Sequence, residues 1–565
     1  MFLKNNNLSK KLILDILDLY QQQNPSEKIN RYLPILKKSD QSIISRKNFA
    51  GHITVSAFVI DPTLSKLLLV YHKNLKKYLQ PGGHVENNDK SLWLAALREL
   101  EEETGIKDVF LLPKDESNPE IPLDIDIHRI PKNPQKNEPS HLHFDFGYLF
   151  LANKDNEWKI NKKEITSLTW KNIDELEKEN IPNKFRLIKK IKKLILKRRD
   201  FIFFNEIIKK FSINLKDVKI VAVLHIVPDI LSFVDILKHQ VKKILIIPKK
   251  NSINENILSK IPKEFIFFTT RENLKKETVL EKVFSDNEKS VIIDIGGYFA
   301  TEEFINFNKK KRIDLGIVED TENGHLKYEK IKNNLHLPII SVARSQLKRN
   351  EDDLVGYSIG FYTEWVIRKM RRIPKFITCG IIGYGKIGKS IANFLFNQNI
   401  KPLVYDIDPI KLVEALKDGA IVVRKKDEVL ENNELIFCAT GNNSLSISDF
   451  LKIRPGCYIA SVTSSDDEFD LSKINRYFTI TKENEIITKY ENENTYFYLI
   501  NNGNAVNFID KEGDRVSDFI RLVQAEILVS LGKIVKNSVP FGIHQTSIEE
   551  KRKIAALFLD YYCQK

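Results

Sequence analysis

Two kinds of hydrophobic pattern alternate in the first third of the chain. Runs rich in β-branched and aromatic residues, which favour strands, lie at 52–60, 66–73, 141–152 and 164–170. The segment SLWLAALRELEEETG (91–105) instead repeats its leucines at the spacing of one helical face, and Gly105 supplies a common C-terminal cap. Residues 1–48 predict one or two further helices. This part of the chain is therefore expected to pack helices against a sheet.

Beyond residue 200 the pattern changes to short, continuously apolar runs separated by helical stretches. These runs lie at 219–227, 242–250, 264–270, 290–297, 312–320, 338–343, 376–385, 401–408, 434–441 and 457–463. Continuous apolar strands between helices are typical of parallel sheets buried on both faces. The predicted class is α/β, with two Rossmann-like, doubly wound domains of largely parallel sheets in this part of the chain.

A basic helix is predicted between the two patterns, at NKFRLIKKIKKLILKRRD (183–200). One interpretation is a surface that binds a membrane or a nucleic acid. The other, which we favour, is a solvated helix that bridges two domains, since a charged face is the usual state of a surface helix. The helix marks a candidate domain boundary.

Charge and composition narrow the class of protein further. The net charge of the 565 residues is +14, but basic residues are spread along the chain among acidic ones, and no nucleic-acid-binding motif accompanies them. The four cysteines form no closely spaced pair that would indicate a disulfide framework or a zinc site. No apolar run is long enough to span a bilayer, and the N-terminus lacks the pattern of a signal peptide. We expect a cytoplasmic protein with no membrane or nucleic-acid partner.

Three carboxylates share one face of the helix predicted at 91–105. Glu99, Glu102 and Glu103 stand at i, i+3 and i+4, where like charges repel. A divalent cation between them would offset that repulsion, and oxygen ligands favour Mg²⁺ or Mn²⁺. The preceding Gly82 and Gly83 let the backbone approach a metal or a phosphate closely. A helix with several glutamates is also common on protein surfaces.

The sequence around these carboxylates resembles the Nudix box, G-x5-E-x7-R-E-U-x-E-E-x-G-U, where U is a bulky aliphatic residue. Arg98 to Ile106 matches its second half in full. In the first half, Gly83 is followed six residues later by Asp89 instead of Glu, and one additional residue separates Asp89 from Arg98. Residues 1–175 as a whole look like a Nudix domain, an α/β/α sandwich.

The Nudix resemblance implies hydrolysis of a nucleoside diphosphate linked to another group. It implies a metal site formed by Glu99, Glu102, Glu103 and the backbone of Gly83, with Arg98, Glu102 and Glu103 in catalytic roles. The general base is open, because its place varies in the family: it is a carboxylate of the box or of a later loop. Further candidates for substrate contact or for the base are Glu138, His141, His143 and Asp145.

A second motif lies in FITCGIIGYGKIGKSIANFLF, which reads as strand, tight turn and helix. Gly383, Gly385 and Gly388 are in G-x-G-x-x-G register, and Asp406 follows Gly388 by 18 residues, at the end of the next predicted strand. An acid at that distance binds the ribose hydroxyls of NAD and repels a 2′-phosphate. The combination predicts an NAD site; the alternative is a turn whose glycines serve packing alone.

Residues 205–535 look like adenosylhomocysteinase, a family that oxidises the 3′-hydroxyl of its nucleoside substrate with bound NAD. The resemblance is carried by VLHIVPDI (223–230), DIGG (294–297), GIVEDTENG (316–324), SQLKRNEDDLVG (345–356), GYGKIGKS (383–390), YDIDPIKLVEA (405–415), CATGN (438–442) and GNAVNF (503–508). It implies a homo-oligomer. It also implies that the cofactor is bound by Gly383, Gly385, Lys386, Ile387, Gly388, Asp406, Thr321, Thr440 and Asn507.

The family's catalytic residues are only partly present. His225 stands at a substrate-site histidine, Lys348 at the catalytic lysine and Asp352 at the aspartate that follows it, while Asp320 replaces a glutamate.

Other positions of the family pattern are lost. They are a catalytic aspartate, now Ile295; an asparagine, now Asp353; a cysteine, now Tyr357; and a histidine, now Ser464. The elimination and hydration cycle of the family needs an acid and a base at the ribose, and Ile295 can be neither. Hydrolysis of adenosylhomocysteine is therefore not expected, whereas Lys348 and His225 could still support a simple hydride transfer.

The predicted organisation is a Nudix domain (1–180), a basic linker helix (181–203), a homologue of the adenosylhomocysteinase substrate domain (204–360), an NAD-binding Rossmann domain (361–510) and returning C-terminal helices (511–565). The leading hypothesis is a Mg²⁺-dependent Nudix hydrolase of a nucleotide-derived small molecule, fused to an NAD-binding region with altered catalytic residues. One alternative is an NAD-dependent oxidoreductase acting on a nucleoside- or sugar-like substrate. The other is an NAD(H)-sensing module that regulates the Nudix domain.

Overall fold

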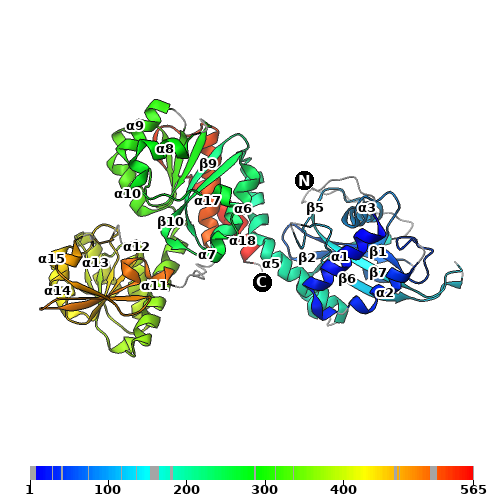
Figure 1. Cartoon of the computed structure of the whole chain (residues 1–565), viewed down its shortest axis with the longest axis horizontal. Helices are drawn as coiled ribbons and strands as arrows, with labels where there is room; N and C mark the ends of the chain where they lie inside the picture. Colours follow the sequence, from blue (N-terminus) through cyan, green and yellow to red (C-terminus); the bar gives the residue numbers. More distant parts are fainter. Residues whose placement is uncertain are drawn as a thin grey trace. The chain divides into compact units, whose positions relative to one another are not determined.

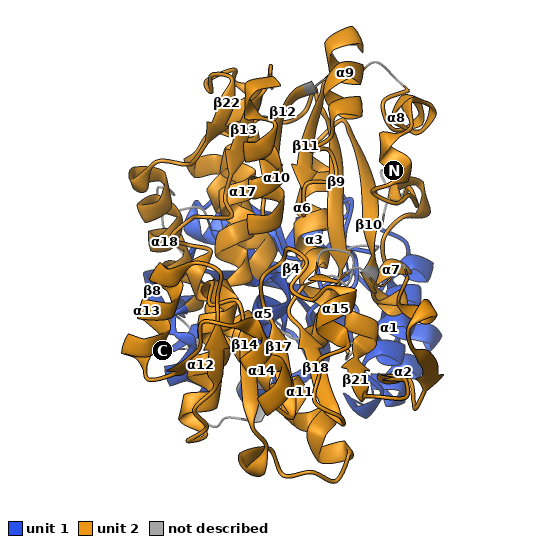
Figure 2. Cartoon of the chain, turned by 90° about the vertical axis from the view of Figure 1, so that its left-hand side faces the viewer, with its two compact units in different colours: residues 1–199, 563–565 blue, residues 200–562 orange. Residues whose placement is uncertain are grey.

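The chain forms two compact units, residues 1–199 with 563–565, and residues 200–562 (Figure 2). The computed structural model describes the whole chain except residues 1–7, 28, 40–41, 74–75, 116–117, 135–136, 153–164, 179–181, 286–287, 312–313, 335, 464–467, 470, 472, 510–517 and 564–565. Among the described residues, no helix combines the length and the apolar character that crossing a bilayer requires.

The first unit is built on one mixed sheet (Figure 1). Its strands are β1 (His52–Ile60), β2 (Lys66–His72), β3 (Lys77–Leu79), β4 (Gly82–His84), β5 (Val109–Leu111), β6 (Asp124–Ile130), β7 (His141–Ala152) and β8 (Ile165–Asn172). The order is β3-β2-β1-β7-β5, with β4 beside β1, β6 beside β7 and β8 beside β2. The central pair β1 and β7 is parallel, and the other pairs are antiparallel. The strands predicted from the apolar runs are confirmed.

The two faces of this sheet differ because side chains alternate along each strand. On one face, Val55 and Val59 of β1 and Phe144 and Phe146 of β7 are buried in the core. The helices of this unit are α1 (Lys10–Gln23), α2 (Leu33–Lys38), α3 (Leu92–Thr104), α4 (Ile173–Lys178) and the start of α5 (Pro182–Lys210). Residues of α1 and α3 belong to the same core. On the opposite face, the first halves of β1 and β7 carry polar side chains: His52, Thr54 and Ser56 on β1, and His141, His143 and Asp145 on β7.

Helix α3 begins and ends as its sequence predicts. The Ser91 side chain accepts a hydrogen bond from the Leu94 N–H, which caps the N-terminus. Gly105 adopts a left-handed conformation (φ +73°) and its N–H bonds to the Glu101 carbonyl. Leu100 is fully buried between these ends. The local signals therefore set the length of the helix that carries the carboxylates.

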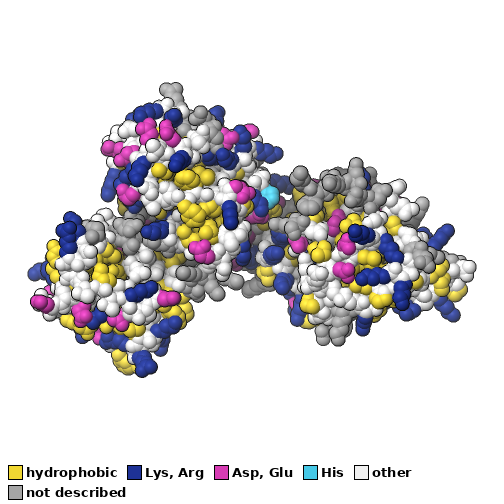
Figure 3. All heavy atoms as spheres, viewed as in Figure 1, with side chains coloured by type: hydrophobic (Ala, Val, Ile, Leu, Met, Phe, Trp, Pro, Cys, Tyr) yellow, Lys and Arg dark blue, Asp and Glu magenta, His cyan; other side chains and the backbone are white. Residues whose placement is uncertain are grey.

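The basic helix α5 runs from the first unit into the second, and its first half is more than a solvated bridge. Within the first unit, Lys190 Nζ lies 2.5 Å from Glu27 and 2.6 Å from Asp124, and Arg186 lies 3.0 Å from Asp124. The Tyr20 hydroxyl joins this group by donating to Glu27. Part of the positive charge of the helix is thus neutralised inside the unit. On the face that Figure 3 shows, basic and acidic side chains are interspersed.

The second unit contains two sheets. The first is parallel throughout, in the order β10-β9-β11-β12-β13-β22. Its strands are β9 (Lys219–Ile226), β10 (Lys243–Ile253), β11 (Ser290–Asp294), β12 (Asp314–Glu319), β13 (Pro338–Ser341) and β22 (Gly542–His544). Its helices include α6 (Leu231–Gln240), α7 (Glu255–Leu258), α8 (Glu277–Val283), α9 (Glu302–Lys311), α10 (Glu322–Lys330), α17 (Ile520–Val535) and α18 (Ile548–Tyr562). The C-terminal segment thus returns to this sheet through β22.

The strand predicted at 264–270 is wrong. Lys263–Phe265 forms a 3₁₀ turn, and only a single bridge joins Ile266 to Ile246. Phe267 packs against the core, whereas Phe268 is exposed. A short apolar run is compatible with a turn packed beside an edge strand as well as with a strand.

The second sheet has the order β16-β15-β14-β17-β18-β21-β20-β19. Its strands are β14 (Cys379–Ile382), β15 (Leu403–Tyr405), β16 (Ile421–Val422), β17 (Leu435–Cys438), β18 (Cys457–Ser461), β19 (Thr479–Lys482), β20 (Ile487–Glu491) and β21 (Tyr496–Ile500). They are parallel from β16 to β21 and antiparallel beyond it. Helices α11 (Arg349–Lys369), α12 (Lys386–Asn397), α13 (Pro409–Asp418), α14 (Lys426–Asn432) and α15 (Ile447–Phe450) accompany it. The strand order reverses between β14 and β17, which is where doubly wound sheets bind ligands. The α/β class with largely parallel sheets is confirmed.

Candidate catalytic and cofactor sites

Helix α3 and the glycine loop before it are closely packed against each other. A Cβ atom at Gly83 would lie 2.4 Å from Glu99 Oε2, so the Glu99 carboxylate occupies the space that any other side chain would need. The Gly82 N–H points to Glu103 Oε2 at 3.3 Å. The two glycines therefore allow the backbone of β4 to reach two carboxylates of α3.

Arg98 connects the carboxylates to one another. Its guanidinium bonds to Asp89 through two nitrogens, at 3.1 and 3.0 Å. It also lies 3.0 Å from Glu99 and 3.3 Å from Glu102, and it donates to the His84 carbonyl at 2.9 Å. Asp89, where the sequence departs from the Nudix box, thus contacts the arginine of the box.

Burial and the ion pairs of Arg98 together determine the charges on α3. Burial raises the pKa of Glu99, while the adjacent Arg98 acts in the opposite direction. Burial opposes the charge of Arg98, but its hydrogen bond to Asp89 and the charge of Glu99 raise its pKa overall. The Glu102 side chain is 55 % exposed, so this carboxylate faces solvent. Oxygen donors that range from buried Glu103 to open Glu102 suit a hard cation such as Mg²⁺.

The four further candidates of this unit lie in different surroundings. Asp145 is buried and accepts hydrogen bonds from Ser56 at 2.6 Å and Thr54 at 3.0 Å, and burial raises its pKa. Glu138 lies on the loop before β7, with its carboxylate 3.8 Å from Arg46.

His141 and His143 are neighbours on β7, and their Nε2 atoms are 3.2 Å apart. The structure shows that they are part of a larger polar cluster that the sequence analysis did not identify. Its additional members are His52, His84, Asp126 and His128. The available signal was the alternation of polar residues in HITVS, DIDIH and HLHFD, which places every second side chain on one face of a strand.

The glycine turn of the second unit lies between β14 and α12. Gly383 has φ +97°, and a Cβ at Gly388 would lie 2.1 Å from the Gly383 carbonyl oxygen. Gly385 caps α12, and a Cβ there would meet nothing within 4 Å. The first and third glycines therefore serve packing, while the second leaves open space at a helix N-terminus, where a phosphate binds.

Asp406 is held toward this turn from both sides. Its carboxylate accepts the Tyr384 N–H at 2.6 Å and the Asp408 N–H at 2.8 Å. The acid predicted to select NAD is therefore positioned by the backbone of the glycine turn itself.

Two of the other predicted cofactor contacts, Thr440 and Asn507, lie beside the second sheet, whereas Thr321 precedes α10, a helix of the first sheet. Asn507 is buried, and its side-chain oxygen has no hydrogen-bond partner among the described residues, which fits a ligand donor. Thr440 donates to Glu468, a fully buried carboxylate that the sequence analysis did not identify and that also accepts from the Gly441 N–H. Thr321 caps α10 by accepting the Gly324 N–H.

Lys386 and Ile387 occupy the first positions of α12. The Lys386 ammonium donates to the Ala343 carbonyl at 2.7 Å and lies 3.4 Å from Asp352. Ile387 packs against the core of the second sheet. Lys386 thus joins the glycine turn to a segment of the first sheet of the same unit.

Lys348 lies in a group of acids. Its ammonium is 3.1 Å from Asp320 and 2.8 Å from Glu351. Burial disfavours its charge, but these two acids raise its pKa overall. Burial raises the pKa of Glu351 to about 7. At neutral pH the lysine is therefore held charged in the arrangement seen here.

His225 is stacked on Phe508, with ring centroids 5.1 Å apart, and its Nδ1 lies 2.5 Å from Ser252 Oγ. Burial, together with the charges of Lys249 and Lys348, lowers its pKa. The imidazole is thus neutral. Among the lost positions, Ile295 is buried, Tyr357 and Asp353 are exposed, and Ser464 lies outside the described residues.

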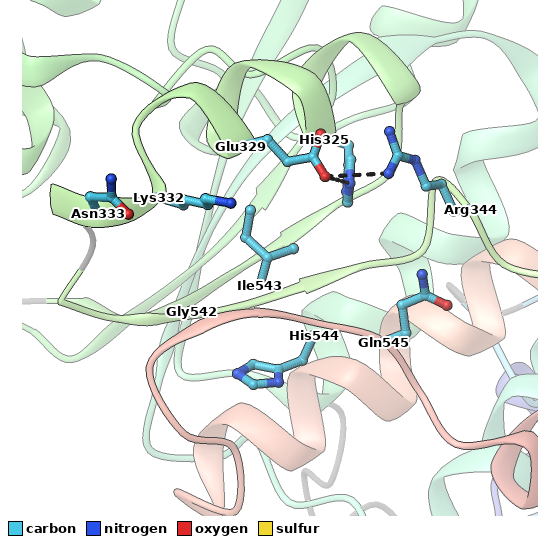
Figure 4. Close-up of a pocket in the computed structure, with 9 residues that line it drawn as sticks. All are labelled: His325, Glu329, Lys332, Asn333, Arg344, Gly542, Ile543, His544 and Gln545. Atoms are coloured by element: carbon cyan, nitrogen blue, oxygen red, sulfur yellow. Dashed lines mark hydrogen bonds and ion pairs between the residues drawn. The ribbon is translucent and has the colours of Figure 1, made fainter.

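A hollow of about 550 Å³ lies elsewhere, beside α10 and β22 (Figure 4). Its walls include His325, Glu329, Arg344 and His544. The Glu329 carboxylate accepts from His325 at 3.1 Å and from Arg344 at 3.3 Å, so it is already paired. None of the predicted site residues lines this hollow.

One unit thus has a helix whose carboxylates pack against a pair of glycines, and the other has a doubly wound sheet with a glycine turn followed by an acid. Both arrangements are typical of nucleotide-binding proteins. The family comparisons specify both parts. Residues 51–191 match the model of the NUDIX domain, and residues 373–511 match the NAD binding domain of S-adenosyl-L-homocysteine hydrolase. The chain is thus a fusion of a Nudix hydrolase domain and an adenosylhomocysteinase-like NAD-binding domain.

Two curated relatives have names related to the second of these families. The S-inosyl-L-homocysteine hydrolase of Methanopyrus kandleri is 24% identical over 293 residues, which cover 50% of this chain and 67% of the relative. The adenosylhomocysteinase of Sulfolobus acidocaldarius is 24% identical over 375 residues, or 63% of this chain and 87% of the relative. A solved hydrolase of the NUDIX family from Clostridium perfringens is 27% identical, covering 26% of this chain and 97% of its own, with a TM-score of 0.20.

Proposed function

We propose that the chain is a Mg²⁺-dependent Nudix hydrolase that acts on a nucleoside diphosphate linked to another group, and that its second unit binds NAD. The observation that carries the hydrolase is the packing of Gly83 against Glu99, with Arg98 joined to Glu99, Glu102 and Asp89. A surface helix with unrelated glutamates has no reason to adopt this arrangement.

The residues of α3 have separate tasks in this proposal. Glu99, Glu102 and Glu103, with the backbone of Gly83, hold the cation, and Arg98 fixes the directions of Glu99 and Glu102. Bound Mg²⁺ supplies polarisation of the pyrophosphate and a lower pKa of the attacking water. Glu102 is the carboxylate most open to solvent. We therefore propose that it acts as the general base, which accepts the proton of the attacking water.

The test compares two adjacent glutamates. Glu102→Gln is expected to lower the rate of hydrolysis by about 100-fold or more, with Mg²⁺ and a panel of nucleoside diphosphate conjugates as substrates. Glu101→Gln is the matched control, because Glu101 pairs with Lys107 outside the Arg98 group and is similarly exposed. Equal rates for both variants would contradict the proposal.

For the second unit, we propose that the open space at Gly385, the acid Asp406 and the buried oxygen of Asn507 bind NAD. The cofactor supplies an acceptor or donor of hydride when bound. Denaturing purified protein and identifying the released nucleotide tests this directly. NAD⁺ or NADH in the supernatant is the expected result. Protein that carries none and binds none on titration would contradict it.

The surroundings of Lys348 and His225 support a second candidate function for this unit, an NAD-dependent oxidoreductase acting on a nucleoside- or sugar-like alcohol. A buried lysine ammonium can orient an alcohol by donating a hydrogen bond to its oxygen. A neutral imidazole can accept the proton of that alcohol. Lys348→Met is expected to abolish oxidation while leaving bound NAD in place. If this variant keeps every activity, the unit is better explained as an NAD(H) sensor, and NAD(H) should then change the rate of hydrolysis.

A further inference from the structure

Several histidines converge on the polar face of the first unit's sheet. His52 of β1 and His143 of β7 are direct partners in the parallel register, and His141 lies two residues before His143 on the same face. His84 of β4 is paired with Thr54, and His128 of β6 with His143. Residues far apart in sequence are thus brought onto one face by strand pairing alone.

Three of these rings are close enough to share one ion. The ring centroid of His52 is 5.0 Å from that of His141 and 4.6 Å from that of His143. The Nε2 atoms of His141 and His143 are 3.2 Å apart, and one nitrogen of each of the three residues lies within 4.8 Å of the others. A tetrahedral ion with metal–nitrogen bonds of about 2.0–2.1 Å needs ligand nitrogens roughly 3.3 Å apart.

Hydrogen bonds to backbone carbonyls set the tautomers of two rings. His52 Nδ1 lies 3.2 Å from the Asn48 carbonyl, and His141 Nδ1 lies 2.8 Å from the Pro139 carbonyl. A carbonyl only accepts, so each Nδ1 carries the proton and each Nε2 presents a lone pair. Ligating histidines are oriented in this way by the groups behind them.

The lone pair of His52 Nε2 is unpaired in the part of the chain that the structure describes. Its Nε2 is buried and has no hydrogen-bond partner among the described residues, and the whole residue is 1% exposed. A proton on His143 could satisfy the contact between His143 and His141, but it would leave His52 as it is. A buried polar atom without a partner is rare in folded proteins, and a bound ion is one of the arrangements that account for it.

The three rings are withdrawn from bulk solvent to different degrees, because His52 and His141 are buried and His143 is half-buried. Of the two other rings in the cluster, His128 is less available, because its Nδ1 already lies 2.9 Å from the Asp126 carboxylate.

We propose that His52, His141 and His143 bind a transition-metal cation of the Zn²⁺ type. Imidazole nitrogens favour such borderline ions, whereas the oxygen-only carboxylates of α3 favour Mg²⁺. The two sites therefore take different metals, and the histidine site does not depend on the Nudix activity. His143 is only half-buried, so a water or an oxygen of a bound ligand can complete the coordination.

The site is connected to the Nudix box through one residue. His84 follows Gly83, its carbonyl accepts the hydrogen bond of Arg98, and its ring lies 5.2 Å from that of His52 and 5.5 Å from that of His143. A metal at the histidines would thus stiffen the strands that support the loop at Gly83.

Co²⁺ added to the untagged full-length protein tests the site, with excess Mg²⁺ present for the carboxylates. Tetrahedral Co²⁺ on nitrogen absorbs strongly in the visible range, whereas octahedral Co²⁺ on oxygen absorbs weakly. We expect one equivalent with the strong spectrum, and a loss of affinity of about 100-fold or more in His141→Asn. His128→Asn, on the same face but bound to Asp126, is the matched control and should keep the site.

A wild-type protein without the strong Co²⁺ spectrum, or an unchanged spectrum in His141→Asn, would overturn the proposal. If His141→Asn does not fold, X-ray absorption of Zn²⁺ on the wild-type protein decides instead. Scattering from three imidazoles at about 2.0–2.1 Å supports the site, and a shell of oxygen alone overturns it.

Discussion

Two glycines at the two sites of this protein serve opposite purposes. At Gly83 the place of a Cβ is taken by the Glu99 carboxylate, at 2.4 Å. At Gly385 the same place is empty, with nothing within 4 Å. The first glycine lets the protein close upon its own carboxylates, and the second keeps space for something that is not protein. The presence of a glycine in a motif therefore does not indicate its role until the atoms around it are known.

Removal of divalent metal should separate the two sites most clearly. Chelation with EDTA is expected to abolish hydrolysis, by roughly a thousandfold or more, because several kcal/mol of charge stabilisation is lost. NAD bound at Gly385 and Asp406 should remain, since the binding proposed there requires no metal. Release of NAD on chelation, measured by its absorbance after filtration, would show that the sites are not independent.

Gly83→Ala should have the next largest effect. The new methyl group must displace Glu99, and hydrolysis is expected to fall by about 100-fold, comparable to the loss of a catalytic group. Steady-state rates with Mg²⁺ measure this. NAD content is the internal control for folding of the rest of the chain. An alanine variant with wild-type rates would mean that the Glu99 position seen here is not the active one.

Asp406→Ala tests the acid of the second site. Hydrogen bonds to a charged group contribute about 1.5–3 kcal/mol, so the affinity for NAD is expected to fall roughly 10- to 100-fold. Titration of NAD followed by fluorescence or calorimetry gives the change. The matched variant is Asp408→Ala, which removes only the cap of α13. A smaller effect for Asp406 than for Asp408 would contradict the assignment.

Gly385→Ala should have the smallest effect on the fold and a selective one on binding. The residue has φ −73° and an open surrounding, so the change in the free energy of unfolding should be limited to about 1 kcal/mol, the cost of alanine at a helix N-cap. The methyl group would, however, enter the space left for the pyrophosphate and weaken NAD binding by about tenfold. Unaltered NAD affinity, measured beside a denaturation curve, would argue that the turn is only structural.

The elements that carry local signals were predictable in detail. Helix α3 has a serine cap at Ser91, a glycine stop at Gly105 and a regular leucine spacing, so its limits follow from a short stretch of chain. The same holds for β1 and β7. The run at 264–270 failed, because a strand needs a partner along its length and only Ile266 finds one.

At each of the two sites, too, some features follow from the sequence and others from the tertiary structure. The carboxylates of α3 come from consecutive turns of one helix, and the glycine turn with Asp406 comes from one strand–helix–strand unit, so the sequence by itself determined both motifs and the types of ligand they suit. Tertiary structure decided which residues contact these motifs: Asp89 accepts hydrogen bonds from Arg98, and Glu468 accepts one from Thr440. It also decided that the space beside Gly385 is open.

The histidine cluster shows most clearly what the sequence alone could not predict. His52, His84 and the pair His141 and His143 lie on separate strands, and each alone is an ordinary alternating polar residue. They lie together only because β7 pairs with β1 in parallel and β4 pairs with β1 in antiparallel, each in one particular register. Since a shift of one residue would turn these rings to the opposite face, only the pairing of the folded sheet decides that they lie together.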